Sequence, residues 1–137
     1  MLSQILIFAS AAIVFTLGTI HLIYTFASNK FQPRDLAVAE QMKQVAPVIS
    51  KQTTMWLAWI GFNASHSLGA MLFGVLYGYL IVFHFQFLLQ AKFLLLVGAL
   101  FLGSLVLLAK RYWFSVPFVG IVSSTVLFLA GAALAVA

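Results

Sequence analysis

The chain has 137 residues, of which 64% are hydrophobic and 7% are charged, with seven basic side chains against two acidic ones. An average soluble protein carries about 25% charged residues, so this composition excludes a soluble domain and predicts a protein solvated by lipid. The absence of cysteine excludes disulfides, thiolate metal ligands and thiol nucleophiles.

Long stretches without a charged residue mark the predicted membrane spans. A bilayer core of about 30 Å requires about 20 apolar residues in a helix. The uncharged run between Lys51 and Lys92 exceeds one span, so we expect a long helix there that ends in a turn at 83–86. The sequence thus predicts an all-α four-helix transmembrane bundle. It forms one domain over residues 1–137, with spans at about 5–27, 54–82, 88–109 and 116–136.

The basic residues predict the orientation of the chain. Six of the seven lie in two connections: Lys30, Arg34, Lys43, Lys51, Lys110 and Arg111. With four spans these two connections share one side, so the positive-inside rule places both in the cytoplasm and both termini outside, in the cytoplasmic (inner) membrane. The net charge of +5 therefore follows the topology. It does not indicate nucleic-acid binding, because no basic run interleaves with aromatic residues in a soluble segment.

The cytoplasmic connection 28–53 is the only sizeable polar segment, and we expect a short helix inside it. Pro33 stands where a helix can begin and Pro47 where it must end. Four apolar residues share one face of this helix: Val38, Met42, Val45 and Ala46. This amphipathic pattern suits a helix lying on the lipid headgroups, and a solvated helical connector is the alternative.

Polar side chains gather on the first two spans. At about 100° per residue one stripe of the second span holds Trp56, Trp59, Asn63, His66, Ala70, Gly74 and Tyr77. The comparable stripe of the first span holds Ser3, Ser10, Gly18, His21 and Thr25. Because consecutive helices usually pack together, we expect the stripes to face each other and the two imidazoles to approach. A buried histidine needs hydrogen-bond partners, for which Asn63, Ser67 and Thr25 are the nearest candidates.

Placing a polar or ionisable side chain inside a membrane span costs free energy, so this cluster is a candidate functional site. The leading interpretation is an intramembrane pocket that binds a small ligand or a lipid, formed by His21, Thr25, Trp59, Asn63, His66 and Ser67. A hydrogen-bond network that only holds the helices together explains the same residues equally well. Haem b, with His21 and His66 as axial ligands, is a further alternative. A metal site is not expected, because zinc or copper needs a third ligand and His84 lies at the outer end of the bundle.

The residues argue against an enzyme. Both carboxylates, Asp35 and Glu40, lie in the connection 28–53, so no pair of carboxylates can perform acid–base catalysis inside the spans. Histidine is the only side chain in the spans that titrates near neutrality. Proton abstraction by His66 and a histidine-based proton relay therefore stay open, and we name no catalytic residue.

Small residues on the spans predict close helix packing. Gly74 and Gly78 form a small-xxx-small ridge, and Gly103 and Gly120 belong to similar ridges on the last two spans. Such ridges also suit a homo-oligomer, or docking as an accessory or structural subunit of a larger membrane complex, which is the alternative function. Membrane lipids are expected partners in either case.

Three segments carry a resemblance to a known family. They are Trp56-Leu57-Ala58-Trp59-Ile60-Gly61-Phe62-Asn63-Ala64-Ser65-His66-Ser67-Leu68-Gly69, Pro33-Arg34-Asp35, and Arg111-Tyr112-Trp113-Phe114 before Pro117. Over nearly the whole chain they resemble an uncharacterised bacterial family of small four-span integral membrane proteins. The resemblance implies a bacterial origin and the same fold. It implies no chemistry, because the family has no assigned activity, but it places the polar stripe inside a resembling segment and so favours a site over a scaffold.

Overall fold

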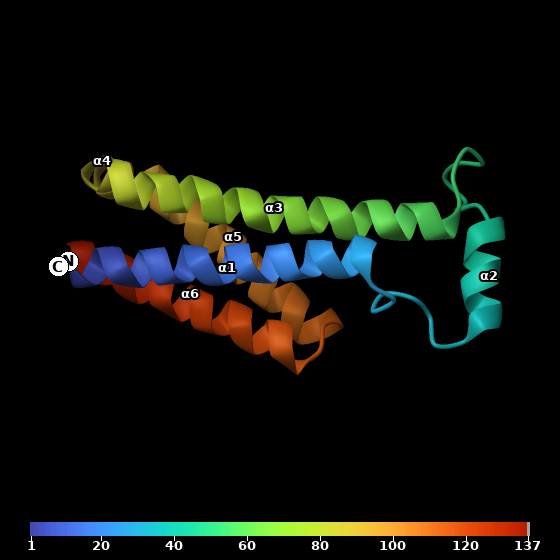
Figure 1. Ribbon diagram of the computed structural model, residues 1–137. Coiled ribbons are helices and arrows are strands. Elements are labelled where there is room, and N and C mark those ends of the chain that lie inside the picture. Colours follow the sequence, from blue (N-terminus) through green and yellow to red (C-terminus); the bar gives the residue numbers. More distant parts are fainter. Residues whose placement is uncertain (137) are drawn as a thin grey trace. The chain divides into compact units, whose positions relative to one another are not determined.

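A computed structural model describes residues 1–136, with the side chains of residues 1–135, and this part of the chain is helical without any strand. The helices are α1 (Leu2–Ala27), α2 (Leu36–Gln44), α3 (Met55–Phe83), α4 (Phe85–Gln90), α5 (Lys92–Tyr112) and α6 (Ser115–Val136) (Figure 1). The all-α prediction is confirmed. In the described residues α1, α3, α5 and α6 are long and apolar enough to cross a membrane.

Local chemistry explains where several helices begin and end. Asp35 caps α2, because its carboxylate accepts a hydrogen bond from the backbone N–H of Ala37 at 2.8 Å and so satisfies a donor that the first turn leaves free. At the start of α3 the hydroxyl of Thr54 accepts from the N–H of Leu57 at 3.3 Å. Pro117 lies in the first turn of α6, where a missing N–H costs no intrahelical bond.

The connection between α3 and α5 differs from the prediction. The expected turn at 83–86 is present in that α3 ends at Phe83. The third long helix, however, begins at Lys92 and not at residue 88, because residues Phe85–Gln90 form the separate helix α4. Leu88 of α4 is fully buried. The position of α4 is therefore set by packing, and no glycine, proline or charge before Lys92 marks it in the sequence.

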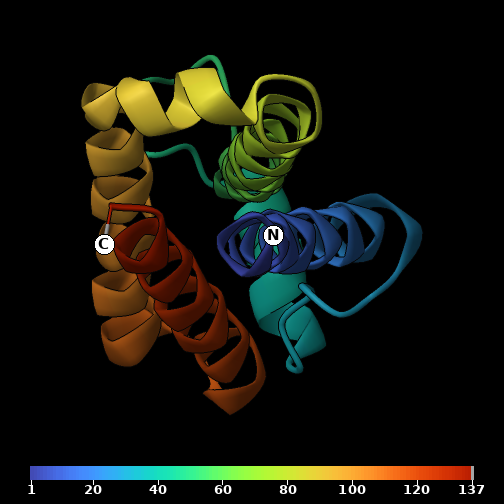
Figure 2. The same cartoon turned by 90° about the vertical axis from the view of Figure 1, so that its left-hand side faces the viewer.

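Contacts divide the chain into two compact units. The bundle unit comprises Met1–Leu17 and the described residues from Ala70 onward, and the loop unit comprises Gly18–Gly69. Helices α1 and α3 each contribute to both units. In the bundle unit the beginning of α1 and the end of α6 lie at the same end, and α4 crosses there from α3 to α5 (Figure 2).

Within the bundle unit, α1 packs closely against α3 and α6. A Cβ placed on Gly74 would lie 2.5 Å from the Cβ of Phe15 and 2.9 Å from the carbonyl oxygen of Ala11. On the other side, the hydroxyls of Ser10 and Ser124 are 2.8 Å apart, and Ser124 also donates to the carbonyl of Ser10 at 3.1 Å. Both serines are fully buried, so the pair forms a polar link between α1 and α6 inside an apolar core.

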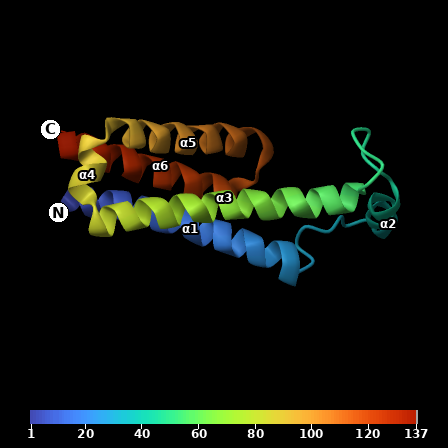
Figure 3. The same ribbon diagram turned by 90° about the horizontal axis from the view of Figure 1, so that it is seen from above.

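Helices α5 and α6 run side by side in the bundle unit (Figure 3), and an aromatic cluster joins both of them to α3. Phe73 stacks on Tyr77 with ring centroids 4.4 Å apart and on Phe101 at 4.9 Å, and Phe128 meets Tyr77 edge-on at 5.6 Å. The hydroxyl of Tyr77 donates to the carbonyl of Leu94, which satisfies its only polar atom in an apolar environment.

The four glycines predicted to pack helices divide into two groups. Gly74 and Gly120 lie at close contacts, since a Cβ on Gly120 would be 2.9 Å from Leu17. At Gly78 and Gly103 an added Cβ would meet nothing within 4 Å among the described residues, because these sides of α3 and α5 face away from neighbouring helices. The sequence reasoning missed two contact glycines, Gly98 beneath Phe128 and Gly131 against Ile7.

In the loop unit, α2 lies across the direction of α3 (Figure 1). Its buried residue is Ala39, with Met42 half-buried, whereas Val38 is exposed. Val45 and Ala46 of the predicted apolar face lie beyond the end of the helix, because α2 ends at Gln44. The backbone N–H of Met55 donates to the carbonyl of Val45 at 2.8 Å, and this bond ties the end of the loop to the start of α3.

Candidate functional site

The candidate site lies in the loop unit, where His21 of α1 meets Asn63 of α3. The Nε2 atom of His21 and the Oδ1 atom of Asn63 are 3.0 Å apart. Because an amide oxygen only accepts hydrogen bonds, Nε2 of His21 must carry the hydrogen. The amide nitrogen of Asn63 donates to the carbonyl of Trp59 at 2.8 Å, which fixes the amide orientation. Asn63 is buried, and both ends of its amide are satisfied.

His66 completes the polar centre of this unit. Its ring is half-buried and meets the His21 ring edge to face, with centroids 5.4 Å apart and an interplanar angle of 69°. The spacing of His66 three residues after Asn63 puts both side chains on the face of α3 that receives His21. The structure therefore brings together His21, Asn63 and His66, which we call the histidine cluster.

Thr25 and Ser67 support the cluster through their own helices. The hydroxyl of Thr25 donates to the carbonyl of His21 at 2.8 Å, and the hydroxyl of Ser67 donates to the carbonyl of Asn63 at 2.9 Å. Both are bonds to the residue four positions earlier, a common arrangement for hydroxyl side chains within a helix. Both residues are buried, and their donor hydrogens are used within the helix and do not reach a histidine.

Phe31, which sequence reasoning missed, covers the cluster from the connection after α1. Its ring centroid lies 4.5 Å from that of His21 and 6.5 Å from that of Trp59. The indole N–H of Trp59 donates to the carbonyl of Phe31 at 3.1 Å and so holds this loop residue against α3. No periodic pattern identifies Phe31, because the connection has no regular structure at this position.

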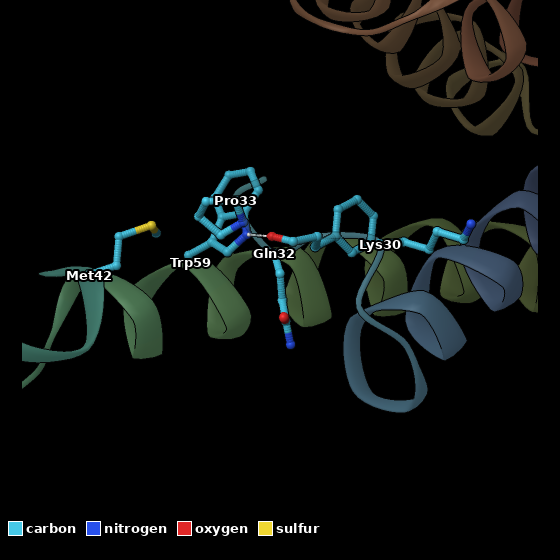
Figure 4. Close-up of a pocket in the computed structure, with 6 residues that line it drawn as sticks. Lys30, Gln32, Pro33, Met42 and Trp59 are labelled. Carbon is cyan, nitrogen blue, oxygen red and sulfur yellow. Dashed lines mark hydrogen bonds between the residues drawn. The ribbon is translucent and has the colours of Figure 1, made fainter. Parts of the chain in front are cut away.

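An open, shallow pocket of about 340 Å³ lies in the same unit (Figure 4). Its lining residues are Lys30, Phe31, Gln32, Pro33, Met42 and Trp59. Met42 and Lys30 lie on opposite sides of Trp59 and Pro33, and the side chain of Lys30 extends away from these two residues (Figure 4). The volume falls at the lower end of the range of about 300–1,000 Å³ typical of small-molecule sites. Trp59 and Phe31 belong both to the pocket and to the surroundings of the cluster.

The geometry does not fit haem between the two histidines. Axial ligation places the two imidazoles on opposite faces of a porphyrin, whereas the rings of His21 and His66 contact each other directly. Nε2 of His21 is moreover bonded to Asn63. Among the described residues no group of three or more histidine, aspartate or glutamate side chains is placed to hold a metal ion.

The remaining ionisable groups of interest lie outside the cluster. His84, between α3 and α4, is exposed, and its Nε2 atom is 3.1 Å from the hydroxyl of Tyr79. The carboxylate of Glu40 accepts from Lys43 at 2.6 Å, and that of Asp35 caps α2. Both acidic groups thus have partners in the loop unit and neither joins the histidine cluster.

Comparison of the chain with protein-family models, curated proteins and solved structures found no match in any of the three.

Proposed function

We propose that this chain is a multi-pass protein of a bacterial inner membrane that binds a small ligand or a lipid at the histidine cluster. In this proposal both connections that carry basic residues face the cytoplasm, both termini lie outside, and α2 rests on the lipid headgroups. The distribution of Lys and Arg supports the orientation, and the exposure of Val38 on α2 and of Val45 just after it supports contact with lipid.

The observation that carries the proposal is the convergence of polar side chains on one point of two helices that are long and apolar enough to cross a membrane. His21, Asn63 and His66 come from α1 and α3 and contact Phe31 and Trp59, which also line an open pocket. A pure scaffold needs only satisfied hydrogen bonds. It has no need for a pocket at the same place, whereas binding sites combine apolar walls with a few convergent polar groups.

Native mass spectrometry of the protein released from mild detergent tests the proposal. The unmodified chain should retain a bound small molecule or lipid, and His66→Leu should lose it. His84→Leu is the matched control, because it removes an exposed histidine outside the cluster and should retain the ligand. A full ligand complement on His66→Leu with unchanged affinity contradicts the proposal. Circular dichroism checks that both variants keep the helical content of the parent.

A second candidate function, docking as a subunit of a larger membrane complex, is favoured by a ridge on α3. Gly61, Ser65 and Gly69 are spaced four residues apart and all are exposed. A Cβ added to either glycine meets nothing within 4 Å in the described part of the chain. Small residues at this spacing let helices of separate chains approach closely.

Replacing both ridge glycines by leucine tests this second function. If the chain is a subunit, the unmodified protein should purify with a stoichiometric partner, and Gly61→Leu/Gly69→Leu should purify alone. The matched control is Ala130→Leu/Ala133→Leu, which also adds bulk at two exposed small residues but outside every predicted ridge. Purification of the unmodified protein alone, with a bound ligand, favours the first function.

A further inference from the structure

We infer that the pocket between Lys30 and Met42 binds an anionic amphiphile from the membrane, such as a fatty acid or an acidic phospholipid. The acidic headgroup lies at Lys30 and the hydrocarbon chain runs along Trp59 and Pro33 toward Met42. This inference rests on the proposed function, because Phe31 and Trp59 join the pocket to the histidine cluster. The pocket residues Lys30, Pro33 and Met42 would then bind the ligand in addition to the histidine cluster, and the ligand would be an anionic amphiphile.

The walls of the pocket select the hydrocarbon part of the ligand. Phe31, Pro33, Met42 and Trp59 are aromatic or aliphatic, and the single polar hydrogen of the Trp59 ring is already donated to the carbonyl of Phe31. These four residues therefore offer dispersion contacts and removal of apolar surface from water, worth about 0.8 kcal/mol for each buried methylene group. A small hydrophilic metabolite gains little from such walls.

The charge at the pocket selects an anionic headgroup. Lys30 is the only charged residue among the described residues that line it. Neither carboxylate competes for this ammonium group: in the described part of the chain neither Asp35 nor Glu40 lines the pocket or pairs with Lys30, and Glu40 pairs with Lys43. Lys30 and Met42 lie on opposite sides of Trp59 and Pro33 (Figure 4). The pocket thus has a cationic end and an apolar end, which is the arrangement that an amphiphile requires.

The surroundings of the pocket favour a ligand that arrives from the bilayer. Lys30 follows the last turn of α1, and Trp59 lies in the first turns of α3, so the pocket is at the level where two predicted spans end. The segment between them exposes large apolar side chains: Leu36, Val38, Val45, Val48 and Ile49. Basic and apolar side chains interleaved in this way are typical of segments that contact anionic lipid.

Trp59 itself provides the probe for the test. Replacing Trp56 and Trp113 by phenylalanine leaves Trp59 as the only tryptophan of the chain. This protein is placed in nanodiscs of zwitterionic phospholipid and titrated with a brominated fatty acid, whose bromines quench tryptophan at contact. We expect quenching that saturates. A chain that keeps only Trp113 reports nonspecific partitioning into the bilayer and should show weaker quenching that does not saturate.

Charge reversal at Lys30 tests the headgroup. Lys30→Glu should weaken binding of the brominated fatty acid by roughly 5- to 30-fold, since one lost exposed pair is replaced by a repulsion. Lys51→Glu, which changes the same charge in the same connection but outside the pocket, should bind as the parent does. In the chain with all its tryptophans, native mass spectrometry should show the added fatty acid lost from Lys30→Glu and kept by Lys51→Glu, independently of the tryptophan substitutions.

Two arms distinguish the sources of the ligand, and both support the inference. Saturable quenching by the free fatty acid points to a fatty acid, and saturable quenching by a small fraction of brominated acidic phospholipid in the disc points to a phospholipid. The inference is overturned by quenching of Trp59 that never saturates with either lipid, or by equal affinity in Lys30→Glu and Lys51→Glu. Displacement by a short-chain soluble carboxylate also overturns it, because it shows a soluble anion site.

The outcomes separate this inference from the proposed function. In one outcome, quenching of Trp59 saturates and depends on Lys30, while His66→Leu retains its full ligand complement. This result supports ligand binding in the pocket and contradicts the proposed role of the histidine cluster. In the opposite outcome, His66→Leu loses the ligand and quenching of Trp59 does not saturate. This result supports ligand binding at the histidine cluster and contradicts binding of an amphiphile in the pocket.

Discussion

Substitution of Gly74 by alanine should destabilise the bundle unit, whereas the same substitution at Gly78 should not. An added methyl group at Gly74 would lie 2.5 Å from the Cβ of Phe15, 2.9 Å from the carbonyl oxygen of Ala11 and 3.0 Å from the Cα of Phe15. Packed carbon atoms are normally about 3.5–4.0 Å apart. Two of these three atoms belong to the backbone of α1, so relief requires α1 and α3 to separate by about an ångström.

The magnitude follows from comparing the two positions. Overpacking of a close contact costs about 1–3 kcal/mol, while replacing a helical glycine by alanine gains about 0.8–1.0 kcal/mol in helix propensity. The propensity gain applies to both glycines and cancels in the difference between them. We therefore expect the free energy of unfolding of Gly74→Ala to lie about 1–3 kcal/mol below that of Gly78→Ala, which should exceed the parent by about 0.8–1.0 kcal/mol.

Titration of the purified protein in mild detergent with sodium dodecyl sulfate measures this difference. Unfolding is followed by circular dichroism, and tryptophan fluorescence provides a second signal. Equal stability of Gly74→Ala and Gly78→Ala would refute the reasoning, because it would mean that α1 does not approach α3 at Gly74.

Two further predictions concern the bundle unit and the orientation of the chain. Ser10→Ala, Ser124→Ala and the double variant can be compared by the same titration. The two substitutions should show a coupling free energy of about 0.6 kcal/mol and at most about 1.7 kcal/mol, the range for hydrogen bonds between membrane helices. Strictly additive losses of stability would show that the two hydroxyls are not bonded. Because the chain has no cysteine, single cysteines report orientation directly. On intact cells a membrane-impermeant maleimide should label Gln86→Cys, at the turn predicted to lie outside, and should not label Gln44→Cys, in the connection predicted to face the cytoplasm. Both positions are exposed, and the opposite labelling pattern would reverse the topology.

Much of the fold was predictable because charge is so scarce in this sequence. Each long helix occupies a stretch without internal charge, and Lys92, Lys110 and Arg111 lie at the ends of α5. Helix α4 was not predictable for the same reason: residues Phe85–Gln90 are uncharged and contain no glycine or proline. A helix break in such a run leaves no local signal and depends on the burial of Leu88.

The candidate site was predictable only in part, because helical periodicity identifies a face but not the neighbour that the face meets. The predicted stripes do meet where His21 contacts Asn63 and His66. Ser10 belongs to the same stripe of α1, yet it bonds to Ser124 of α6, because a helix in a bundle has neighbours on two sides. Phe31 lies outside any periodic element, so periodicity gave no signal for its position over His21.

The hydrogen bonds already present in the histidine cluster limit how a ligand could bond to it. Among the described residues no buried side-chain nitrogen or oxygen lacks a partner, as a bilayer without water demands. A ligand that bonded to Asn63 would therefore have to displace His21 or the carbonyl of Trp59, losing about as much as it gained. Trp59, by contrast, is 39% exposed, and the pocket beside it offers apolar contact without displacing any of these bonds.

This difference favours a division of roles between the cluster and the pocket. His66 contacts His21, His21 contacts Phe31, and Phe31 accepts the hydrogen bond of Trp59, so a change at His66 reaches the pocket through a continuous series of packed rings. His66→Leu would then weaken binding by moving Phe31, which makes His66 a positioning residue. If His66 instead contacts the ligand directly, His66→Leu should lose binding, and the fluorescence of Trp59 in the ligand-free variant should equal that of the parent. Positioning predicts that the emission of Trp59 shifts in the ligand-free variant.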